Sequence, residues 1–540
     1  MEEFDYVVVG AGSAGCVVAG RLAEEPGTSV VLLEAGGRDS HPTLKMPVAF
    51  LKAVVNPRFN WGYVTEPEPQ LRGRQLGLPR GRVLGGSSSI NGMFYMRGHP
   101  LDYEDWKRLG ATGWGYAEVL PYFRRMERSW RGESAYHGGA GPVEVNPINS
   151  PHLLHEPLMG SAVAAGFNSS ADLAAEVSEG FARGEATIDK RGRRVSSATA
   201  YLRPAGSRRN LTVLTGVLVH RIRLENRVAR GVEYEVAGER RTVRARREVI
   251  LSAGTYNSPH LLMLSGVGPG EQLREQGIPV VAELPGVGRN LSEHPTVSME
   301  FDALRPVTFL NQLRFDRVIV SALRWALLGS GPLATQLNSC NVVIRTRPGL
   351  DRPDVQFMAN PLRFDAKIWF PLVTERQSHV FWAGVVGLHP RSRGCVRLKS
   401  PDPHVLAGVT LNLLSDPADL ETLRAGMRAA RHIYRTAPQA RLTGPERLPG
   451  EALQSDDELD AFIRETVYVA MHPVGTCAMG SGREAVVDPQ LRVIGVERLR
   501  VVDASVMPTV PGGNTHATTV MIAEKAVDII RGVPPARSAV

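Results

Sequence analysis

Three closely spaced glycines near the N-terminus have the pattern of a dinucleotide-binding site. The run Gly10-Ala11-Gly12-Ser13-Ala14-Gly15 directly follows an apolar strand and opens a helix. In such a run the first glycine makes a tight turn, the second lets the backbone approach a pyrophosphate, and the third lets helix and strand pack closely. The N–H groups at the helix N-terminus then bind the anion. Glu34 ends the next apolar strand, where an acidic side chain holds ribose hydroxyls.

Two further segments of small residues extend this potential binding surface. One runs from Gly81 to Asn91, and the other runs from Gly254 to Gly268 after another apolar strand. Small residues expose many backbone N–H groups, which suits the second half of a long cofactor. Taken alone, these segments are equally compatible with ordinary turns, and the glycine run fits a nicotinamide dinucleotide as well as a flavin.

Together, the three motifs resemble those of the glucose–methanol–choline (GMC) oxidoreductases, a family of FAD-dependent alcohol oxidases and dehydrogenases. One family signature runs from Gly81 through Gly98 to Glu104 and the other from Gly254 to Gly268, and both are complete. The resemblance extends over about residues 4–532 and is strongest to choline-dehydrogenase-like alcohol dehydrogenases. It implies an α/β fold with a Rossmann-like FAD-binding domain and a discontinuous substrate domain, an antiparallel sheet backed by helices.

The resemblance also implies two catalytic residues. His472, in the run His472-Pro473-Val474-Gly475-Thr476, matches the active-site histidine, and Asn514 stands where the family has His or Asn. Alcohol oxidation removes the hydroxyl proton and moves a hydride to flavin N5. A neutral imidazole is a suitable proton acceptor, and an amide N–H stabilises charge on the same oxygen. Whether His472 is the base or mainly an electrostatic and orienting group stays open at this point.

Further residues of the implied site surround the cofactor. Ile90 stands where some choline oxidases carry the histidine that links FAD, so we expect non-covalent FAD, and we expect no metal. In the segment Gly288–His294, Glu293 replaces the usual Asp, and we expect it to affect packing near the site. For His294, a structural hydrogen bond and a role beside the cofactor are both open. The expected cofactor-binding residues are Gly10, Gly12, Ser13, Ala14, Gly15, Glu34, Ala35, Trp61, Arg82, Val83, Gly85, Gly86, Ser87, Asn91, Gly92, Met93, Val219, Ala253, Gly254, Asp503, Ala504, Asn514, Thr515 and His516.

Substrate and electron acceptor are less constrained. Binding choline calls for an aromatic cage and usually a carboxylate, and residues 337–343, where we place that acid by resemblance, contain none. We therefore expect a neutral primary aliphatic or aromatic alcohol. Choline dehydrogenase or oxidase activity and a non-redox, hydroxynitrile-lyase-like reaction are the alternatives, whereas an NAD-dependent dehydrogenase or a binding protein would leave motifs unexplained. For the acceptor, a quinone or another carrier is favoured slightly over oxygen.

The elements that position these motifs follow from hydrophobic patterning. Continuous apolar strands at 6–9 and 29–33 flank a helix at 14–24, as in a parallel sheet covered on both faces. Alternation over 211–249 predicts an antiparallel meander, followed by a buried strand at 249–251. We expect helices over 101–130, with Leu109 in the core, and over 317–328 and 420–436. The FAD-binding domain is expected to comprise residues 1–155, 191–300 and 463–540, and the substrate domain residues 156–190 and 301–462.

Composition excludes several other classes of protein. The 540 residues are 43% hydrophobic and 22% charged, a globular balance that excludes a disordered chain. The longest apolar stretch, 318–328, is interrupted by Arg324 and is too short to span a membrane. The four cysteines are scattered, which excludes a disulfide framework and a cysteine-based zinc site.

Charge gives a weaker indication of partners and location. The net charge is +8, and the basic run 240–247 looks like a strand with one solvated face. No aromatic interleaving accompanies it, so we expect no nucleic-acid binding, while peripheral contact with membrane phosphates stays open. The acidic N-terminus differs from a secretory signal, so we expect a cytoplasmic protein, a monomer or a homodimer.

Overall fold

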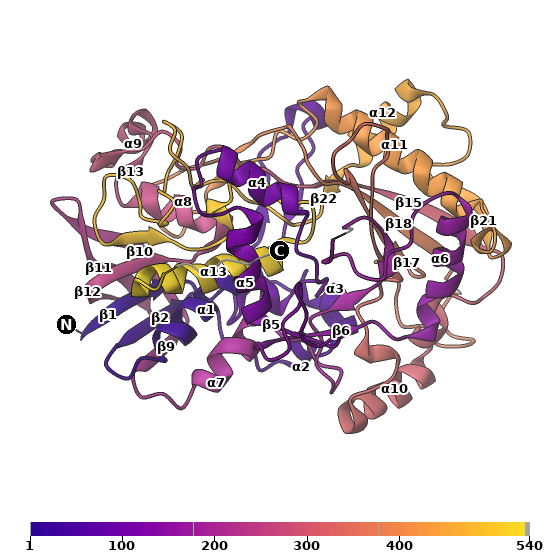
Figure 1. Ribbon diagram of the computed structural model, residues 1–540, viewed down its shortest axis with the longest axis horizontal. Helices are drawn as coiled ribbons and strands as arrows, with labels where there is room; N and C mark the ends of the chain where they lie inside the picture. Colours follow the sequence, from indigo (N-terminus) through magenta and orange to yellow (C-terminus); the bar gives the residue numbers. More distant parts are fainter. Residues whose placement is uncertain (1, 177, 376, 535–540) are drawn as a thin grey trace.

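A computed structural model describes residues 2–176, 178–375 and 377–534. Two large sheets lie side by side, one built around the N-terminal strand and the other around the middle of the chain (Figure 1). This architecture confirms the expected α/β fold with a Rossmann-like part and an antiparallel substrate sheet. All four cysteines are unpaired, and none of the described helices is long and apolar enough to cross a bilayer.

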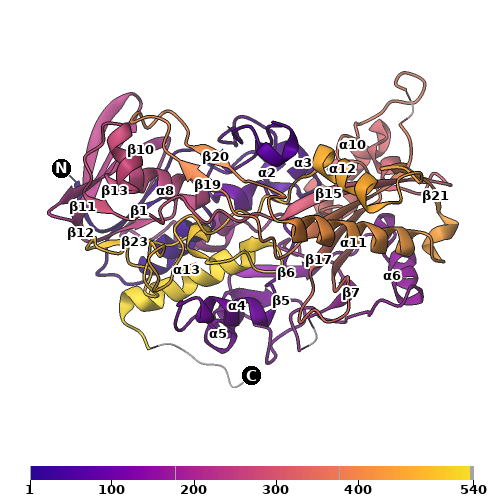
Figure 2. The same ribbon diagram turned by 90° about the horizontal axis from the view of Figure 1, so that it is seen from above.

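The first sheet has a parallel centre. Its strands are β1 (Glu2–Val9), β2 (Val30–Glu34), β9 (Leu211–Thr215), β12 (Glu239–Leu251) and β23 (Leu499–Val501), in the order β9-β2-β1-β12-β23. The parallel parts of β1, β2 and β23 are buried because helices cover the sheet. Among these helices are α13 (Thr515–Arg531; Figure 2) and α1 (Ser13–Leu22), which pack together. Val9 pairs with both Leu33 and Leu251, so the carboxyl ends of three strands meet at one edge.

An antiparallel arm extends this sheet. The strands β10 (Val217–Glu225) and β11 (Val228–Val236) pair with each other, and β11 pairs with the first half of β12. The second half of β12 lies in the parallel centre, so one continuous strand replaces the two that we predicted around Val249. The prediction of a meander was wrong for β9, which pairs in parallel with β2. Alternation of apolar and polar residues does not distinguish antiparallel from parallel pairing, because the partner of a strand depends on the tertiary fold.

The second sheet is antiparallel throughout. Its order is β21 (Thr443–Leu448), β15 (Pro295–Ala303), β18 (Val380–Gly387), β17 (Val355–Asn360), β16 (Cys340–Ile344) and β7 (Gly180–Arg183), with β22 (Tyr468–Val469) also pairing with β15. One face is covered by α11 (Pro417–Tyr434), where Gly426 allows close approach to Val385, and α12 (Asp456–Thr466) packs beside α11 (Figure 1). The five-segment division into domains stays a prediction; β15 spans its boundary at residue 300, and β22 lies beyond its boundary at residue 463.

Residues 101–130, which we expected to be helical, form two helices, α4 (Pro100–Arg108) and α5 (Tyr116–Met126), separated by a turn with glycines of positive φ. Leu109 follows the first helix and is 53% exposed, so its assignment to the core was wrong. The helix α10 (Phe315–Leu328) and α11 confirm the two other expected helices.

The remaining helices are α2 (Pro42–Lys45), α3 (Phe50–Ala53), α6 (His155–Ala164), α7 (Arg203–Ala205), α8 (Gly254–Leu264) and α9 (Gly270–Glu275). The remaining strands are β3 (Tyr63–Val64), β4 (Gly77–Leu78), β5 (Glu127–Ser129), β6 (Val143–Pro147), β8 (Glu185–Ala186), β13 (Val267–Gly268), β14 (Ala282–Glu283), β19 (Cys395–Arg397) and β20 (Gly408–Thr410).

Candidate active site

A cavity of about 710 Å³ extends from the carboxyl edge of the first sheet to the second sheet. Most of the residues expected around the cofactor line it, together with His472. These are Gly10, Gly12, Ser13, Ala14, Glu34, Ala35, Trp61, Gly86, Ser87, Asn91, Gly92, Met93, Val219, Ala253, Gly254, Asp503, Ala504, Asn514, Thr515 and His516. They come from segments far apart in the chain, and the aligned ends of the parallel strands bring several of them together.

Four expected cofactor residues do not line the cavity. Gly15 packs inside the strand–helix turn, where an added Cβ would lie 1.9 Å from the carbonyl oxygen of Gly10. Gly85 has a φ of 87° and makes the turn before Gly86, and Val83 is buried in a small apolar cluster. Arg82 stacks on Trp61, with 4.9 Å between its guanidinium carbon and the ring centroid. These four residues therefore lie next to the residues that line the cavity. Their direct contact with FAD stays a prediction.

Two carboxylates organise the backbone at the sheet edge. Glu34 accepts hydrogen bonds from the N–H groups of Ala11 at 2.9 Å and Gly36 at 2.8 Å, and burial raises its pKa to about 7. Asp503 accepts from the N–H of Gly254 at 2.9 Å and from that of Ser505 at 2.8 Å. Each acid therefore ties together segments whose glycines line the cavity. Among the cavity-lining residues that the structure describes, these two are the only carboxylates.

Two long helices direct their N-termini at the cavity. Residues at the starts of α1 and α13 line it, and neither helix has a side-chain cap on its first N–H groups. Uncapped N–H groups together with the helix dipole favour an anion. Gly86 approaches Gly12 so closely that an added Cβ would lie 2.6 Å from the Cα of Gly12, which keeps this wall free of side chains. The donors, the glycine walls and the volume fit an FAD molecule with its pyrophosphate.

His472 and Asn514 are in direct contact at the other end of the cavity. The Nδ2 atom of Asn514 lies 3.0 Å from Nε2 of His472, and Oδ1 of Asn514 accepts a hydrogen bond from Gln356 at 3.1 Å. Asn514 immediately precedes α13, and His472 follows β22, so the fold joins two segments that are 42 residues apart. Burial, with a contribution from His294, holds the pKa of His472 well below its ordinary value.

The hydrogen-bond chain behind His472 determines which of its nitrogens is unprotonated. Nε2 of His294 lies 2.8 Å from the carbonyl oxygen of Leu388, so this nitrogen carries a hydrogen and donates. Burial lowers the pKa of His294 to about 3, so its Nδ1 is an acceptor at neutral pH. That Nδ1 lies 3.0 Å from Nδ1 of His472, which must therefore donate. Nε2 of His472 is left with a lone pair, directed toward the amide N–H of Asn514.

Glu293 fixes the backbone of both histidines. Its Oε1 accepts hydrogen bonds from the N–H of His472 at 2.6 Å and from the N–H of His294 at 3.0 Å. Burial raises the pKa of Glu293 to about 7, while the charge of Arg80 acts in the opposite direction. Glu293 therefore holds the backbone of both histidines in place, which is more than an effect on packing. Of the two roles left open for His294, the structure shows the structural hydrogen bond.

His516 lies in a different environment. Its Nε2 is 3.3 Å from Oγ of Ser197, and burial, aided by the charge of Arg194, lowers its pKa to about 4. Arg194 donates to Oδ1 of Asn91 at 2.6 Å, which orients another cavity-lining amide. Sequence reasoning missed Arg194 and Gln356. The position of Arg194 just before the small polar residues Ser196 and Ser197 was a weak signal for the first, whereas nothing local distinguished Gln356.

Comparison with known proteins identifies the family. The model described as GMC oxidoreductase matches residues 4–296 with one part and residues 390–523 with another. The chain belongs to the GMC oxidoreductase family. It is an FAD-dependent oxidoreductase, as the sequence motifs predicted. The fold and the glycine-lined cavity of this GMC oxidoreductase are therefore those of a flavoprotein.

Curated relatives and solved structures agree with this assignment. The oxygen-dependent choline dehydrogenase of Rhizobium etli (strain CFN 42) is 44% identical over 537 residues, covering 98% of this chain and 96% of the relative. That of Brucella anthropi is 43% identical over 542 residues, with 99% and 97% coverage. Pyridoxine 4-oxidase from Mesorbium loti has a TM-score of 0.87 at 30% identity, covering 98% of this chain and 99% of that structure. Formate oxidase has a TM-score of 0.90 at 26% identity, with 98% coverage of each chain.

Proposed function

We propose that this GMC oxidoreductase oxidises a neutral primary alcohol to an aldehyde, with His472 as the proton acceptor. The observation that carries the proposal is the position of Nε2 of His472 beside the amide of Asn514 in the FAD cavity, with its Nδ1 in contact with His294. A base must be neutral to accept a proton, and the lowered pKa of His472 keeps it neutral at pH 6.5. The lone pair on Nε2 and the neutral ring both favour a base over a purely orienting group.

The roles of the neighbouring residues follow from their hydrogen bonds. Asn514 donates from Nδ2, and a substrate hydroxyl between Asn514 and His472 would receive this N–H while passing its proton to Nε2. Gln356 holds Oδ1 of Asn514 and so fixes which way the amide faces. When bound, FAD supplies the two-electron chemistry by accepting a hydride from the substrate carbon. The chain provides the proton acceptor, the orientation and the enclosing cavity.

The chemistry of the cavity wall favours a neutral substrate over choline. The substrate end is formed by Gln336, Met358, Asn360, Phe364 and Tyr468, and no carboxylate is among the described lining residues there. The two lining carboxylates, Glu34 and Asp503, are already bound to backbone N–H groups at the sheet edge. A quaternary ammonium ion would therefore lose its hydration without a compensating charge. Choline is the second candidate because the curated relatives carry that name.

A matched pair of substrates tests this choice. Choline and its uncharged isostere 3,3-dimethylbutan-1-ol have nearly the same shape, so they differ mainly in charge. Under anaerobic conditions we expect the flavin absorbance to bleach with 3,3-dimethylbutan-1-ol, 1-hexanol or benzyl alcohol, and to bleach at least about 10-fold more slowly with choline. Faster bleaching with choline would establish the second candidate. A flavin that no alcohol bleaches would contradict alcohol oxidation and favour a non-redox, lyase-like reaction.

Reoxidation of the same reduced enzyme can identify the electron acceptor. We propose a quinone or another carrier as acceptor, in line with the resemblance to dehydrogenases, and oxygen as the alternative. Adding air to the bleached enzyme and, separately, adding a soluble quinone gives two reoxidation rates. Faster reoxidation by the quinone supports a dehydrogenase, and faster reoxidation by oxygen establishes an oxidase.

A further inference from the structure

An exposed apolar surface surrounds α10. Only Ser321 of this helix is buried, and its apolar side chains face outward instead of toward a core. Leu327 and Leu328 are 80% and 73% exposed, and in the adjoining loop Leu372 and Val373 are 106% and 82% exposed. We call this surface the α10 face; it comprises Phe315, Ile319, Val320, Leu323, Leu327, Leu328, Ile368, Phe370, Leu372 and Val373.

The helix and the loop form one continuous surface. The rings of Phe315 and Phe370 are stacked at an angle with 4.5 Å between their centroids, and the N–H of Phe315 donates to the carbonyl of Trp369 at 3.0 Å. Trp325 anchors the helix through a hydrogen bond from Nε1 to the carbonyl of Gly192 at 2.7 Å. In Figure 1, α10 projects from the lower edge of the molecule below the second sheet. An apolar surface of this kind on a projecting element marks an interaction site.

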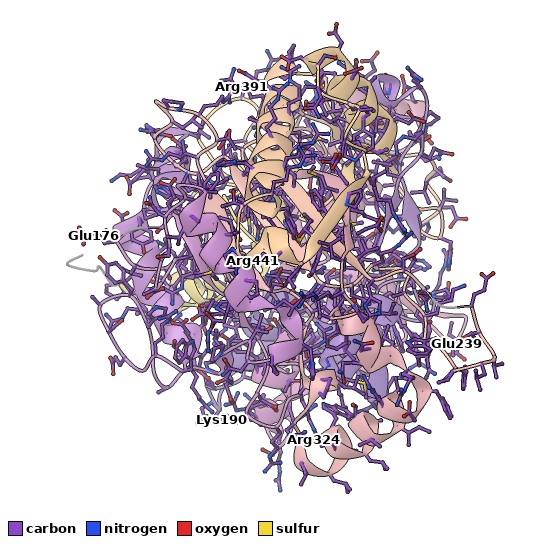
Figure 3. The ribbon with its side chains drawn as sticks, turned by 90° about the vertical axis from the view of Figure 1, so that its right-hand side faces the viewer. Glu176, Lys190, Glu239, Arg324, Arg391 and Arg441 are labelled. Carbon is purple, nitrogen blue, oxygen red and sulfur yellow. The ribbon has the colours of Figure 1, made fainter. Side chains whose placement is uncertain are left out.

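Basic side chains surround the α10 face. Arg317 and Arg324 lie on the helix and are exposed, and Lys190, Arg191 and Arg193 lie in the loop that receives Trp325. Figure 3 shows Lys190 and Arg324 at the same lower end of the molecule. None of these five cations forms an ion pair with a carboxylate of the described residues. By contrast, Asp316 and Asp365 are paired with Arg314 and Arg363, so their charges are neutralised.

We propose that the α10 face docks on the surface of a bilayer that contains anionic phospholipids. Leucine and valine side chains enter the interface, while the arginines and lysines contact lipid phosphates. A second copy of the chain is a poorer occupant, because a twofold interface would bring the same unpaired cations together. The face also adjoins the active-site cavity: Phe50 and Leu51 line the cavity and pack in one apolar cluster with Leu313 and Trp369. Docking would therefore place the cavity wall near the lipid.

Vesicle binding tests this proposal without substrate, so it can fail independently of the proposed function. We expect the purified holoenzyme to sediment with vesicles of phosphatidylglycerol and phosphatidylcholine, and to bind at least about 10-fold more weakly to pure phosphatidylcholine or in ~0.5 M salt. The double variant Leu327→Asp with Leu372→Asp should lose binding while keeping its FAD and its melting temperature, because both side chains are exposed.

A control variant and a measurement of oligomeric state show whether the α10 face itself binds the vesicles. Leu109→Asp changes an equally apolar, exposed residue far from α10 in the sequence and should bind vesicles like the parent protein. Equal loss in Leu109→Asp and in the α10 variant, or no binding of the parent protein to anionic vesicles, would overturn the proposal. If light scattering showed a dimer that the α10 variant alone dissociates, without vesicle binding by the parent, a second copy would be the occupant instead.

A second inference rests on a separate cluster of metal-ligating side chains. Nε2 of His220, on β10, lies 3.4 Å from Oε2 of Glu235, on β11, and Nε2 of His404 lies 3.3 Å from the same oxygen. All three ligand atoms lie within 4.8 Å of one another. His220 is 7% exposed, and its Nε2 has no hydrogen-bond partner among the described residues. A buried ring nitrogen that faces a carboxylate and a second imidazole is suited to a metal ion.

Two of the three separations match those around a tetrahedral zinc ion. Zinc bonds of about 2.0–2.2 Å to nitrogen and oxygen place neighbouring ligand atoms about 3.3–3.5 Å apart. Two imidazoles and one carboxylate are ligands that zinc prefers, and the exposed His404 is free to adjust the third separation. We expected no metal from the sequence, because the three ligands come from separate segments that only the fold brings together.

We infer that His220, Glu235 and His404 bind Zn²⁺ and thereby fasten the loop before β20 to the antiparallel arm. Pro403 and Leu406 of this loop line the FAD cavity, as do Val217 and Val219 of β10. A bound ion would therefore close the cavity wall at this point and slow the release of FAD. Burial lowers the pKa of His220, and the nearby charges of Arg240 and Asp402 shift this pKa in opposite directions.

Calorimetry with Zn²⁺ on chelator-treated holoenzyme tests this site. We expect one equivalent to bind, His220→Ala and His404→Ala to weaken binding at least about 10-fold, and FAD release to slow when Zn²⁺ is present. His432→Ala changes an exposed histidine on α11 and should leave Zn²⁺ binding unchanged. Binding that survives His220→Ala and His404→Ala, or the absence of stoichiometric binding, would overturn the inference.

Discussion

Replacing His472 with alanine will leave FAD bound but slow flavin reduction by the alcohol by about 10³- to 10⁴-fold, the usual contribution of a general base with its orienting effect. The side chain contacts Asn514 at the end of the cavity opposite the glycine turn, so cofactor binding does not depend on it. Stopped-flow absorbance under anaerobic conditions measures the reduction rate, and the protein-bound flavin spectrum measures cofactor retention. Reduction at the parent rate would contradict the assignment of His472 as the base.

A second variant separates proton transfer from orientation. His472→Gln retains an oxygen that accepts the hydrogen bond from Nδ2 of Asn514 but cannot take up a proton at neutral pH. If His472 is the base, this variant should be nearly as slow as the alanine variant. Recovery of most of the parent rate in His472→Gln would show that His472 only orients the substrate.

Replacing His294 with leucine will slow flavin reduction by about 10²-fold, although His294 does not line the cavity. Leucine removes the Nδ1 acceptor that holds the hydrogen of His472 on its own Nδ1, so the tautomer with a protonated Nε2 becomes populated. His294 is therefore a positioning residue. Burial, the main cause of the lowered pKa of His472, remains in this variant, so its slower reduction rate should keep the pH profile of the parent protein.

The expected pH profile follows from the base mechanism. The lowered pKa keeps the base neutral at pH 6.5, so both the parent rate and the slower rate of His294→Leu should be flat from pH 6.5 upward. His294→Asn is the matched control, because its Oδ1 can accept in place of Nδ1 and should restore much of the rate. Equal loss in the Asn and Leu variants would indicate a packing role only.

Local sequence was sufficient for the first strand–helix–strand unit of the fold. The run Gly10–Gly15 predicted a strand, a turn and a helix, and the structure confirms β1 and α1 there, with Glu34 at the end of β2. Such motifs are readable because backbone geometry limits the residue types at each position. Leu109 shows where this reasoning fails: it continues the apolar spacing of α4, yet the helix ends before it and no element covers it.

The sequence by itself determined the family, the FAD cofactor and the presence of His472 and Asn514 as candidates, because each lies within a contiguous motif. Only the tertiary structure decided that His294 contacts His472 across 178 residues, that Gln356 fixes the amide of Asn514, and that the apolar side of α10 faces outward. The physical reason is that a proton's position on an imidazole depends on the partner of the other ring nitrogen. That partner is supplied by packing between distant segments, which no local pattern specifies.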